Sequence, residues 1–304
     1  MPHILCAGIA TLDQIFRLDA MPSRAEKYRA TDLAVTGGGT AANAAVAMAR
    51  LGARVGLFAT LGDDPTGHQI RDGLVEEGVD PGGLRLLPGL RSPLSAIIVD
   101  SAGERMIISH ADPALPRETD WLPDVLPRGV DGVLGDTRWQ EGSAHLFRLA
   151  RAAGRPAVRD GDRAPTIVPE LVDLATHVAF SLQGLCDLTG EADAARALRA
   201  FGPRPDTWIA VTNGAEGVYW WHDGEIVHQP AFLVPAVDTL GAGDTWHGAF
   251  TVRLAEGAGE AEAVRFASAA AALKCTRFGG RDGAPMREEV ETFLADAARA
   301  RSTV

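Results

Sequence analysis

The residues best suited to chemistry lie in a glycine-rich turn, 238–250, which delivers one carboxylate, Asp244, into the start of an apolar helix. Gly241 and Gly243 allow the backbone to turn tightly and to approach a ligand closely. The first amides of a helix have no internal partners and attract anions such as phosphate. A carboxylate there would repel phosphate, so we interpret Asp244 as the base that takes a proton from an attacking hydroxyl.

A second glycine cluster, Gly37–Gly39, leads into a helix made largely of alanines. By itself such a cluster is also typical of a tight turn followed by a closely packed helix. Asn43 favours a binding role, because an amide among alanines needs hydrogen-bond partners and a hydroxyl-rich ligand supplies several.

These residues must be positioned by an α/β framework. Apolar runs of strand length alternate with amphipathic helical stretches, which is the rhythm of a mostly parallel sheet flanked by helices. We expect strands at 3–9, 55–60, 132–135, 157–160, 177–180, 208–212 and 217–221, and a loop at 80–93. Two segments, approximately 13–35 and 95–110, break the rhythm, and the second reads as a hairpin. We expect both to form a small β-sheet lid over the strand ends, where open α/β sheets bind ligands.

Composition narrows the class of protein. The chain has 304 residues, 46% of them hydrophobic, which is enough to bury a large core as one domain spanning 1–304. A formal charge of -11 argues against a nucleic-acid partner and against anionic membrane surfaces. Three widely spaced cysteines predict no disulfide framework, and no apolar run approaches a membrane span of about 20 residues. A cytoplasmic location is expected.

The two glycine motifs together resemble the ribokinase-like, or PfkB-type, carbohydrate kinases. The early signature is matched by 37–67 and the late one by 238–250, and the turn 211–217 is also similar to the family. The resemblance runs over essentially the whole chain. It implies a ribokinase-like fold with a small lid sheet, a sugar substrate and ATP as the phosphoryl donor.

The family's functional positions can be carried over residue by residue. Asp244 would be the base, and the anion hole would be formed by the amides of Gly241, Ala242, Gly243 and Asp244 itself. The sugar hydroxyls would be held by Asp13, Gly38, Gly39 and Asn43. The nucleotide would contact Thr212, Gly214, Gly217, Ala269 and Ala272.

The resemblance also implies metal ions. Asp238 and Thr239 fall where many members bind a monovalent cation such as K⁺, although an Asp before a glycine-rich turn is commonly structural. Family members usually carry an Asn-x-x-Glu element that organises Mg²⁺, whereas the matching stretch here is Ser181–Gly184. Mg²⁺ is still expected, because phosphoryl transfer needs its charge neutralised.

Two cations suggest which sugar is bound. An anionic sugar needs fixed positive charge, and Arg138 ends an expected central strand while Lys27 lies in the first lid segment. Either side chain could equally be a solvated surface charge. Stretches 103–108, 138–139 and 266–281 look similar to bacterial sulfofructose kinases, which implies that Lys27 and Arg138 hold a sulfonate. Position 109 would assist, but Ser109 stands where an asparagine is expected, and His110 follows it.

The sequence therefore predicts an ATP-dependent sugar kinase acting on a primary hydroxyl of a ketose, with 6-deoxy-6-sulfofructose as the favoured substrate. Other sugars remain open, namely 2-keto-3-deoxygluconate, fructose or a hexose phosphate, and nucleosides are a lesser alternative. The missing Asn-x-x-Glu element motivates a different class, a catalytically silent sugar- or nucleotide-binding regulator. Exposed edges of the lid sheet could pair with a second subunit to form a homodimer.

Overall fold

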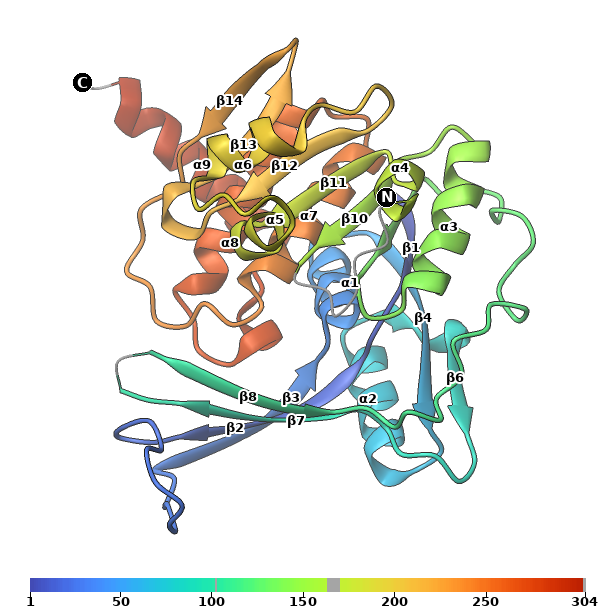
Figure 1. The fold of residues 1–304 in the computed structure, drawn as a ribbon, viewed down its shortest axis with the longest axis vertical. Coiled ribbons are helices and arrows are strands. Elements are labelled where there is room, and N and C mark those ends of the chain that lie inside the picture. Colours follow the sequence, from blue (N-terminus) through green and yellow to red (C-terminus); the bar gives the residue numbers. More distant parts are fainter. Residues whose placement is uncertain (102, 163–169, 303–304) are drawn as a thin grey trace.

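The computed structural model describes residues 1–101, 103–162 and 170–302 and places a twisted central sheet between two layers of helices (Figure 1). The sheet has the order β14-β13-β12-β11-β10-β9-β1-β4-β5, with β6 paired to β4. Pairing is parallel from β5 to β12, and β13 and β14 add an antiparallel hairpin. The strands are β1 (His3–Ala7), β4 (Arg54–Gly62), β5 (Val79–Asp80), β6 (Leu84–Leu87), β9 (Gly132–Gly135), β10 (Ala157–Gly161), β11 (His177–Ser181), β12 (Trp208–Thr212), β13 (Val218–His222) and β14 (Glu225–Gln229).

Alternating side chains of the strands build one core on each face of the sheet. Ile4 and Cys6 of β1 join the core that contains α1, α7 and α8, whereas Leu5 and Ala7 join the core that contains α3, α5 and α6. The helices are α1 (Thr40–Arg50), α2 (Pro65–Glu76), α3 (Gln140–Ala152), α4 (Glu170–Leu174), α5 (Leu182–Thr189), α6 (Ala194–Phe201), α7 (Ala242–Ala255), α8 (Glu260–Cys275) and α9 (Arg287–Ser302). In the described part of the chain, no helix is both long and apolar enough to cross a membrane.

A separate four-stranded sheet, the lid sheet, has the order β3-β2-β7-β8 and lies below the main sheet in Figure 1. Its strands are β2 (Thr11–Arg17), β3 (Asp32–Gly38), β7 (Leu94–Val99) and β8 (Arg105–His110). The expected hairpin within 95–110 is found as β7 and β8. The fold class predicted from the sequence, a ribokinase-like α/β fold with a small separate sheet, is thus confirmed.

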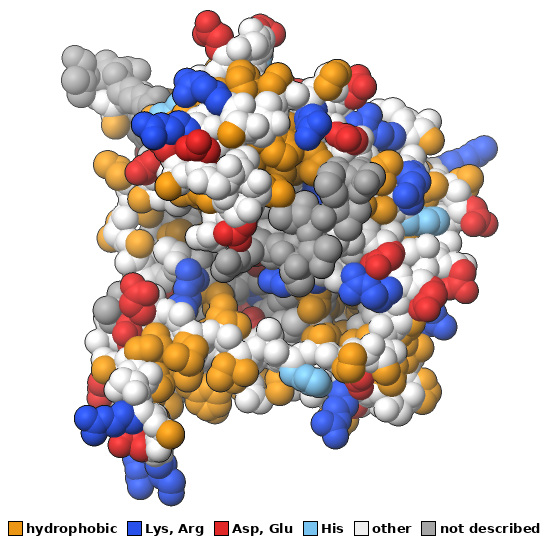
Figure 2. Space-filling model, viewed as in Figure 1, with side chains coloured by type: hydrophobic (Ala, Val, Ile, Leu, Met, Phe, Trp, Pro, Cys, Tyr) orange, Lys and Arg blue, Asp and Glu red, His pale blue; other side chains and the backbone are white. Residues whose placement is uncertain are grey.

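One row of the lid sheet is polar, although the next row on the same face is apolar and consists of Ile15, Ala34, Ile97 and Ile107. The polar row consists of Thr36, Asp13, Ser95 and Ser109, which share a face because paired residues point the same way. The neighbouring rows point to the other face and carry exposed Leu33, Val35, Met106 and Ile108. Hydrophobic side chains accordingly gather over the lid strands in the lower part of Figure 2.

Two strands, β6 and β14, were not predicted from the sequence. β6 lies in the stretch 80–93 that was expected to be a loop, and β14 has only half-buried or exposed residues. Both are edge strands, where the apolar signal is weakest because one side faces solvent.

Candidate active site

The candidate site lies at the carboxyl edge of the main sheet. Asp136 follows β9, Asp160 lies near the end of β10, and Thr212 ends β12. The glycine-rich turn before α7 meets the same edge, because Gly243 and Thr212 line one cavity and Asp160 lies close enough to raise the pKa of Asp244. Polar groups from separate parts of the chain therefore converge where open α/β sheets bind ligands.

Asn43 and Asp244 come together because α1 and α7 pack very closely. Gly248 lies at their crossing, where an added Cβ would approach the carbonyl oxygen of Ala44 to 2.7 Å. Only glycine allows this approach. As a result the Asn43 Nδ2 atom donates to the Asp244 Oδ2 atom at 2.7 Å, across 201 residues of sequence. The Oδ1 atom of Asn43 is buried and has no partner within the described structure, so it is available to a ligand hydroxyl.

The surroundings of Asp244 favour a proton acceptor. Burial and then the nearby charge of Asp160 raise the pKa of Asp244 to about 7, against the opposing effects of the Asn43 hydrogen bond and of His247. Asp160 lies 3.3 Å from the His247 Nδ1 atom, and the Nε2 atom of His247 lies 3.0 Å from the carbonyl oxygen of Ala179. A carboxyl group with a pKa near neutrality is suited to general-base chemistry.

The turn before α7 leaves backbone donors facing open space. Gly241 begins the helix with a φ of 76°, a left-handed conformation that favours glycine, and no side chain of the described structure caps the helix. The amide of Ala242 donates to the Thr239 carbonyl oxygen at 3.2 Å, so it is already engaged. Gly243 has nothing within 4 Å of an added Cβ, so there is open space beside the turn. The amides of Gly241, Gly243 and Asp244 have no acceptor among the described residues, so they are the free donors of the expected set.

The predicted sugar-binding residues of the first half of the chain lie together. An added Cβ on Gly38 would meet the Asp13 Oδ2 atom at 2.0 Å, so the carboxylate lies directly over that glycine. Thr11 donates to the other Asp13 oxygen at 2.8 Å, while burial raises the pKa of Asp13. Gly39 caps α1 with a φ of 92° beside the carbonyl oxygen of Ile9. These contacts place Asp13 next to the start of the helix that carries Asn43.

Asp136 holds several backbone segments of the site together by hydrogen bonds, a role that the sequence did not reveal. Its Oδ2 atom accepts from the amides of Ile9 and Ala41 at 2.8 and 3.3 Å, and its Oδ1 atom accepts from the amides of Arg138 and Trp139 at 2.8 and 3.2 Å. One carboxylate thus ties the Arg138 turn to the start of α1. The only sequence signal was a charged residue directly after a buried strand.

The three residues expected to recognise a sulfonate are exposed. Arg138 follows β9, Lys27 lies in the coil between β2 and β3, and Ser109 is on the edge strand β8. No hydrogen bond or ion pair joins them to one another among the residues that the structure describes. Ser109 nevertheless shares its row of the lid sheet with Asp13, with Ser95 between them.

A cavity of about 300 Å³ is lined by several of the residues expected to contact the nucleotide and reaches the turn before α7. Of the predicted residues, Thr212, Gly214, Gly217 and Ala272 line it. Ala269 does not, because it is fully buried in the core on another face of α8. Sequence reasoning missed the apolar wall of the cavity, which is formed by Ala231, Phe232, Leu233, Val234 and Ala236.

Of the two residues expected to hold a monovalent cation, Asp238 is already engaged. Lys274, which is 0% exposed, donates from its Nζ atom to the carbonyl oxygen of Asp238 at 2.8 Å and to the Asp238 Oδ2 atom at 3.0 Å. Thr239 is exposed and takes no part in this cluster. The arrangement does not fit K⁺ at Asp238, because an ammonium group occupies the oxygens that would bind it.

The stretch that replaces the Asn-x-x-Glu element has a structural role. The Oγ atom of Ser181 accepts from the amide of Gly184 at 3.0 Å, which caps α5, and donates to the Asp162 Oδ1 atom at 3.1 Å. No group of three or more His, Cys, Asp or Glu residues suited to a metal ion is found in the described part of the chain. Asp162 and Asp160 are the carboxylates at this edge that raise the pKa of Asp244.

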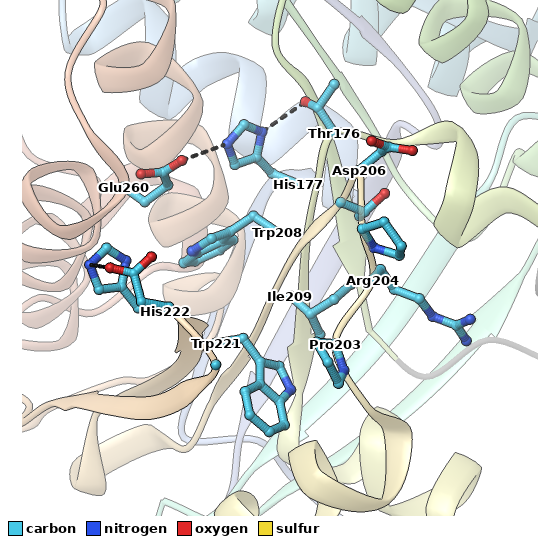
Figure 3. Close-up of a pocket in the computed structure, with 14 residues that line it drawn as sticks. Thr176, His177, Pro203, Arg204, Asp206, Trp208, Ile209, Trp221, His222 and Glu260 are labelled. Carbon is cyan, nitrogen blue, oxygen red and sulfur yellow. Dashed lines mark hydrogen bonds and ion pairs between the residues drawn. The ribbon is translucent and has the colours of Figure 1, made fainter.

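Two further hollows have other positions. One of about 560 Å³ lies between the lid residues Arg17 and Val99 and the loop at Val237, and the molecule is hollowed between the lid and the main body in Figure 2. The other, of about 460 Å³, lies at the amino ends of β11 and β12. There His177 lies between Thr176 and Glu260 (Figure 3). It is at the opposite edge of the sheet from Asp244.

Known proteins resemble this chain over nearly its whole length. The model of the pfkB family carbohydrate kinases matches residues 1–287. A protein of Agrobacterium tumefaciens, 40% identical, superposes with a TM-score of 0.91 over 98% of this chain and 99% of its own. Ribokinase of Bacillus subtilis is 29% identical and covers 97% of this chain and 100% of its own length. Aminoimidazole riboside kinase of Salmonella typhimurium is 31% identical, over 87% of this chain and 90% of its own.

Proposed function

The chain belongs to the pfkB family of carbohydrate kinases, and from that premise we propose that it transfers the γ-phosphoryl group of ATP to a primary hydroxyl of a ketose, with Asp244 as the base. The observation that carries this proposal is the Asn43–Asp244 pair. Asn43 holds a carboxyl group whose pKa is raised to about 7 at the glycine-rich turn, which borders a cavity of about 300 Å³.

The proposed reaction uses groups of this chain in a definite order. Asp244 accepts the proton of the sugar hydroxyl while the hydroxyl oxygen attacks the γ-phosphorus, and the bond to the β-phosphate oxygen breaks to release ADP. The amides of Gly243 and Asp244 stabilise the charge on the transferred group. Asn43 holds the carboxylate in place with Nδ2 and offers Oδ1 to a sugar hydroxyl. Asp13 holds another hydroxyl from the lid side.

Mg²⁺ is part of the proposal. Mg²⁺ is held in many kinases by one or two carboxylates together with substrate phosphates, so a full protein cage is not needed. Asp162 fits that part, because its carboxylate lies at the carboxyl edge beside Asp160 and near Asp244. When bound, the ion would neutralise phosphate charge during transfer.

We favour 6-deoxy-6-sulfofructose as the sugar, phosphorylated at C1. Two features support an anionic substrate: Arg138 lies exposed next to the start of α1, and Ser109 lies in the row of Asp13. Lys27 is a second exposed cation, in the loop beyond Arg17 and Asp32, at the end of β2 and β3 farther from Asp13. The guanidinium group of arginine pairs equally well with sulfonate, phosphate and carboxylate. These features therefore favour an anionic sugar but do not identify which acidic group it carries.

The relatives favour a rival, a sugar without an acidic group. Two of the relatives reported above are a ribokinase and an aminoimidazole riboside kinase. Coupled ADP release should be measured on sulfofructose, fructose, fructose 6-phosphate, 2-keto-3-deoxygluconate and ribose. The highest kcat/KM on sulfofructose is expected, whereas a preference for ribose or fructose would remove the sulfonate assignment but keep the kinase. Binding of ATP and sugar without any sugar-dependent ADP release would support a silent regulator.

Replacing Arg138 tests the anion directly. Arg138→Met should raise KM for sulfofructose roughly 10- to 100-fold, because a hydrogen bond to a charged group contributes about 1.5–3 kcal/mol. KM for fructose should change little. Arg148→Met, an exposed arginine on α3, is the matched control. An equal change of KM for both sugars would make Arg138 structural.

We also propose that two copies pair through the lid sheet. Its face opposite Asp13 exposes Leu33 (54%), Val35 (48%) and Ile108 (61%), which is unusual for a surface that faces only water. Leu33→Glu should then shift a dimer to a monomer in analytical ultracentrifugation. A wild-type protein that sediments as a monomer at high concentration would exclude this pairing.

A further inference from the structure

A buried lysine lies at the end of α8. Lys274 is one of only two lysines in the chain and is 0% exposed, whereas Lys27 is exposed. Taking an ammonium group out of water costs several kcal/mol unless close oxygens compensate it. Lysine is almost never fully buried without such a partner, so this position requires a reason.

The surroundings of the Lys274 Nζ atom are those of a cation site. It faces the carbonyl oxygen of Asp238 at 2.8 Å, the Asp238 Oδ2 atom at 3.0 Å and the carbonyl oxygen of Arg277 at 3.5 Å. All three are acceptors, which matches the three donors and no acceptor of an ammonium group. The last carbonyls of a helix also attract positive charge. Backbone carbonyls with a carboxylate would suit a bare K⁺ ion equally well.

The Lys274–Asp238 pair is connected to the anion-binding turn. The Asp238 Oδ1 atom accepts from the amide of Leu240 at 2.8 Å, immediately before Gly241. The Oδ2 atom accepts from the amides of Gly279 and Gly280, each at 3.1 Å. Asp238 therefore holds the turn against the segment after α8. An uncompensated carboxylate here would repel the incoming phosphates. The positive charge of Lys274 therefore neutralises Asp238 and also holds it in the position that supports the turn.

We infer that the side chain of Lys274 is a built-in replacement for the monovalent cation, so that this kinase works without K⁺. The inference rests on the proposed function for the turn that Asp238 supports. Lys274 acts as a positioning residue, because its charge reaches the reacting atoms only through Asp238 and the backbone of the turn. A cation tethered to α8 cannot be lost by dilution, and its site cannot be occupied by K⁺ at the same time.

The wild-type protein gives the first test. ADP release and thermal unfolding should be measured in potassium, sodium and choline chloride at equal ionic strength, with ATP free of K⁺. We expect kcat/KM within about twofold in all three salts and the same Tm, since no ion binds at Asp238. Activation by K⁺ over choline of about tenfold or more, or a rise of Tm specific to K⁺, would overturn the inference.

Two variants at one position sharpen the test. Lys274→Ala removes the charge and opens space, whereas Lys274→Met removes the charge and fills it. In choline, both should lose roughly tenfold or more in kcat, because the turn is no longer held in register. K⁺ or NH₄⁺ should restore kcat and raise Tm in Lys274→Ala only. Arg265→Met, a half-buried cation on the same helix, should respond to neither ion.

The outcomes separate this inference from the proposed function. If no sugar supports ADP release, the proposed function fails, but the Tm of Lys274→Ala still reports whether K⁺ enters the vacated space. If Lys274→Ala keeps full turnover in choline and its Tm ignores K⁺, the lysine is only a structural ion pair. If neither variant folds, the salt series on the wild-type protein decides alone.

Discussion

Two aspartates flank the same glycine turn, and their surroundings are opposite. Asp238, before the turn, accepts hydrogen bonds from three amides and from the Lys274 ammonium. Burial alone would raise its pKa, but these donors and the positive charge hold the pKa below the ordinary value of 3.8. Asp244, after the turn, accepts one bond, from Asn43, and burial with Asp160 raises its pKa to about 7.

The different surroundings make Asp238 a fixed negative charge and Asp244 a group that can exchange a proton. A carboxylate surrounded by donors stays ionised and holds its neighbours in place. A carboxyl group short of donors and close to another acid can gain or lose a proton near neutral pH. The same residue type, six positions apart, can therefore support the turn in one case and act as the base in the other.

The largest expected effect comes from removing the base. Asp244→Asn should lower kcat by roughly 10²- to 10⁴-fold, the usual contribution of a general base, while sugar and ATP still bind. The fold should not suffer. Because the pKa of Asp244 is raised in the folded protein, its ionised carboxylate destabilises the fold most above about pH 7. The variant should therefore unfold at an equal or higher temperature than the wild type at pH 8. This advantage should fade as pH falls towards 4. Turnover near that of the wild type would remove the role of Asp244.

The next effect should be on stability rather than on chemistry. Asp238→Asn leaves the buried Lys274 ammonium without its counter-ion, which should lower the free energy of unfolding at pH 7 by about 3–5 kcal/mol. Because the folded pKa of Asp238 is lowered, its stabilisation is present above pH 3.8 and is lost as pH falls through the folded pKa. Asp223→Asn, whose side chain is 94% exposed, is the control and should change stability by less than about 0.5 kcal/mol. An equally small change in Asp238→Asn would contradict the proposed support of the turn.

A smaller effect would sharpen the account of the raised pKa. Asp160→Asn removes the charge that contributes most after burial, so the acid limb of kcat/KM should move to lower pH. At pH 6, kcat/KM relative to its plateau should rise roughly three- to tenfold. Asp162→Asn should move the limb in the same direction but less, because its charge contributes less to the pKa of Asp244. It should also lower the plateau, since Asp162 is the residue proposed to hold Mg²⁺. If the acid limb of kcat/KM stays at the same pH in both variants, burial alone sets the pKa of Asp244.

The sequence predicted the parts of the site better than their contacts. The spacing of glycine and aspartate in 238–250 indicated an anion-binding turn with its base, and the alternation of elements indicated the sheet. The contact between Asn43 and Asp244 could not be predicted, because it depends on the helix crossing at Gly248. Ala269 was expected to contact the nucleotide, but it lies on a different face of α8 from the cavity. The face towards the cavity carries Ser268, Ala271, Ala272 and Cys275.

Lys274 shows a different limit. In the sequence it is one cation near the end of an alanine-rich helix, a position where a solvated lysine is common. Its burial follows from the chain segments at Asp238 and Gly279–Gly280, which pack around that helix end. Local patterns carry no information about such a contact. The same holds for Asp136, which bonds amides from three separate segments.

The role of Asp244 as the base is best tested by the pH dependence of kcat/KM, measured side by side for the wild type and Asp244→Asn. The wild-type value should fall tenfold per pH unit below about pH 7, as Asp244 takes up its proton. The residual activity of Asp244→Asn should lack that limb. An identical acid limb in the variant would contradict the claim, because the titrating group would then lie elsewhere.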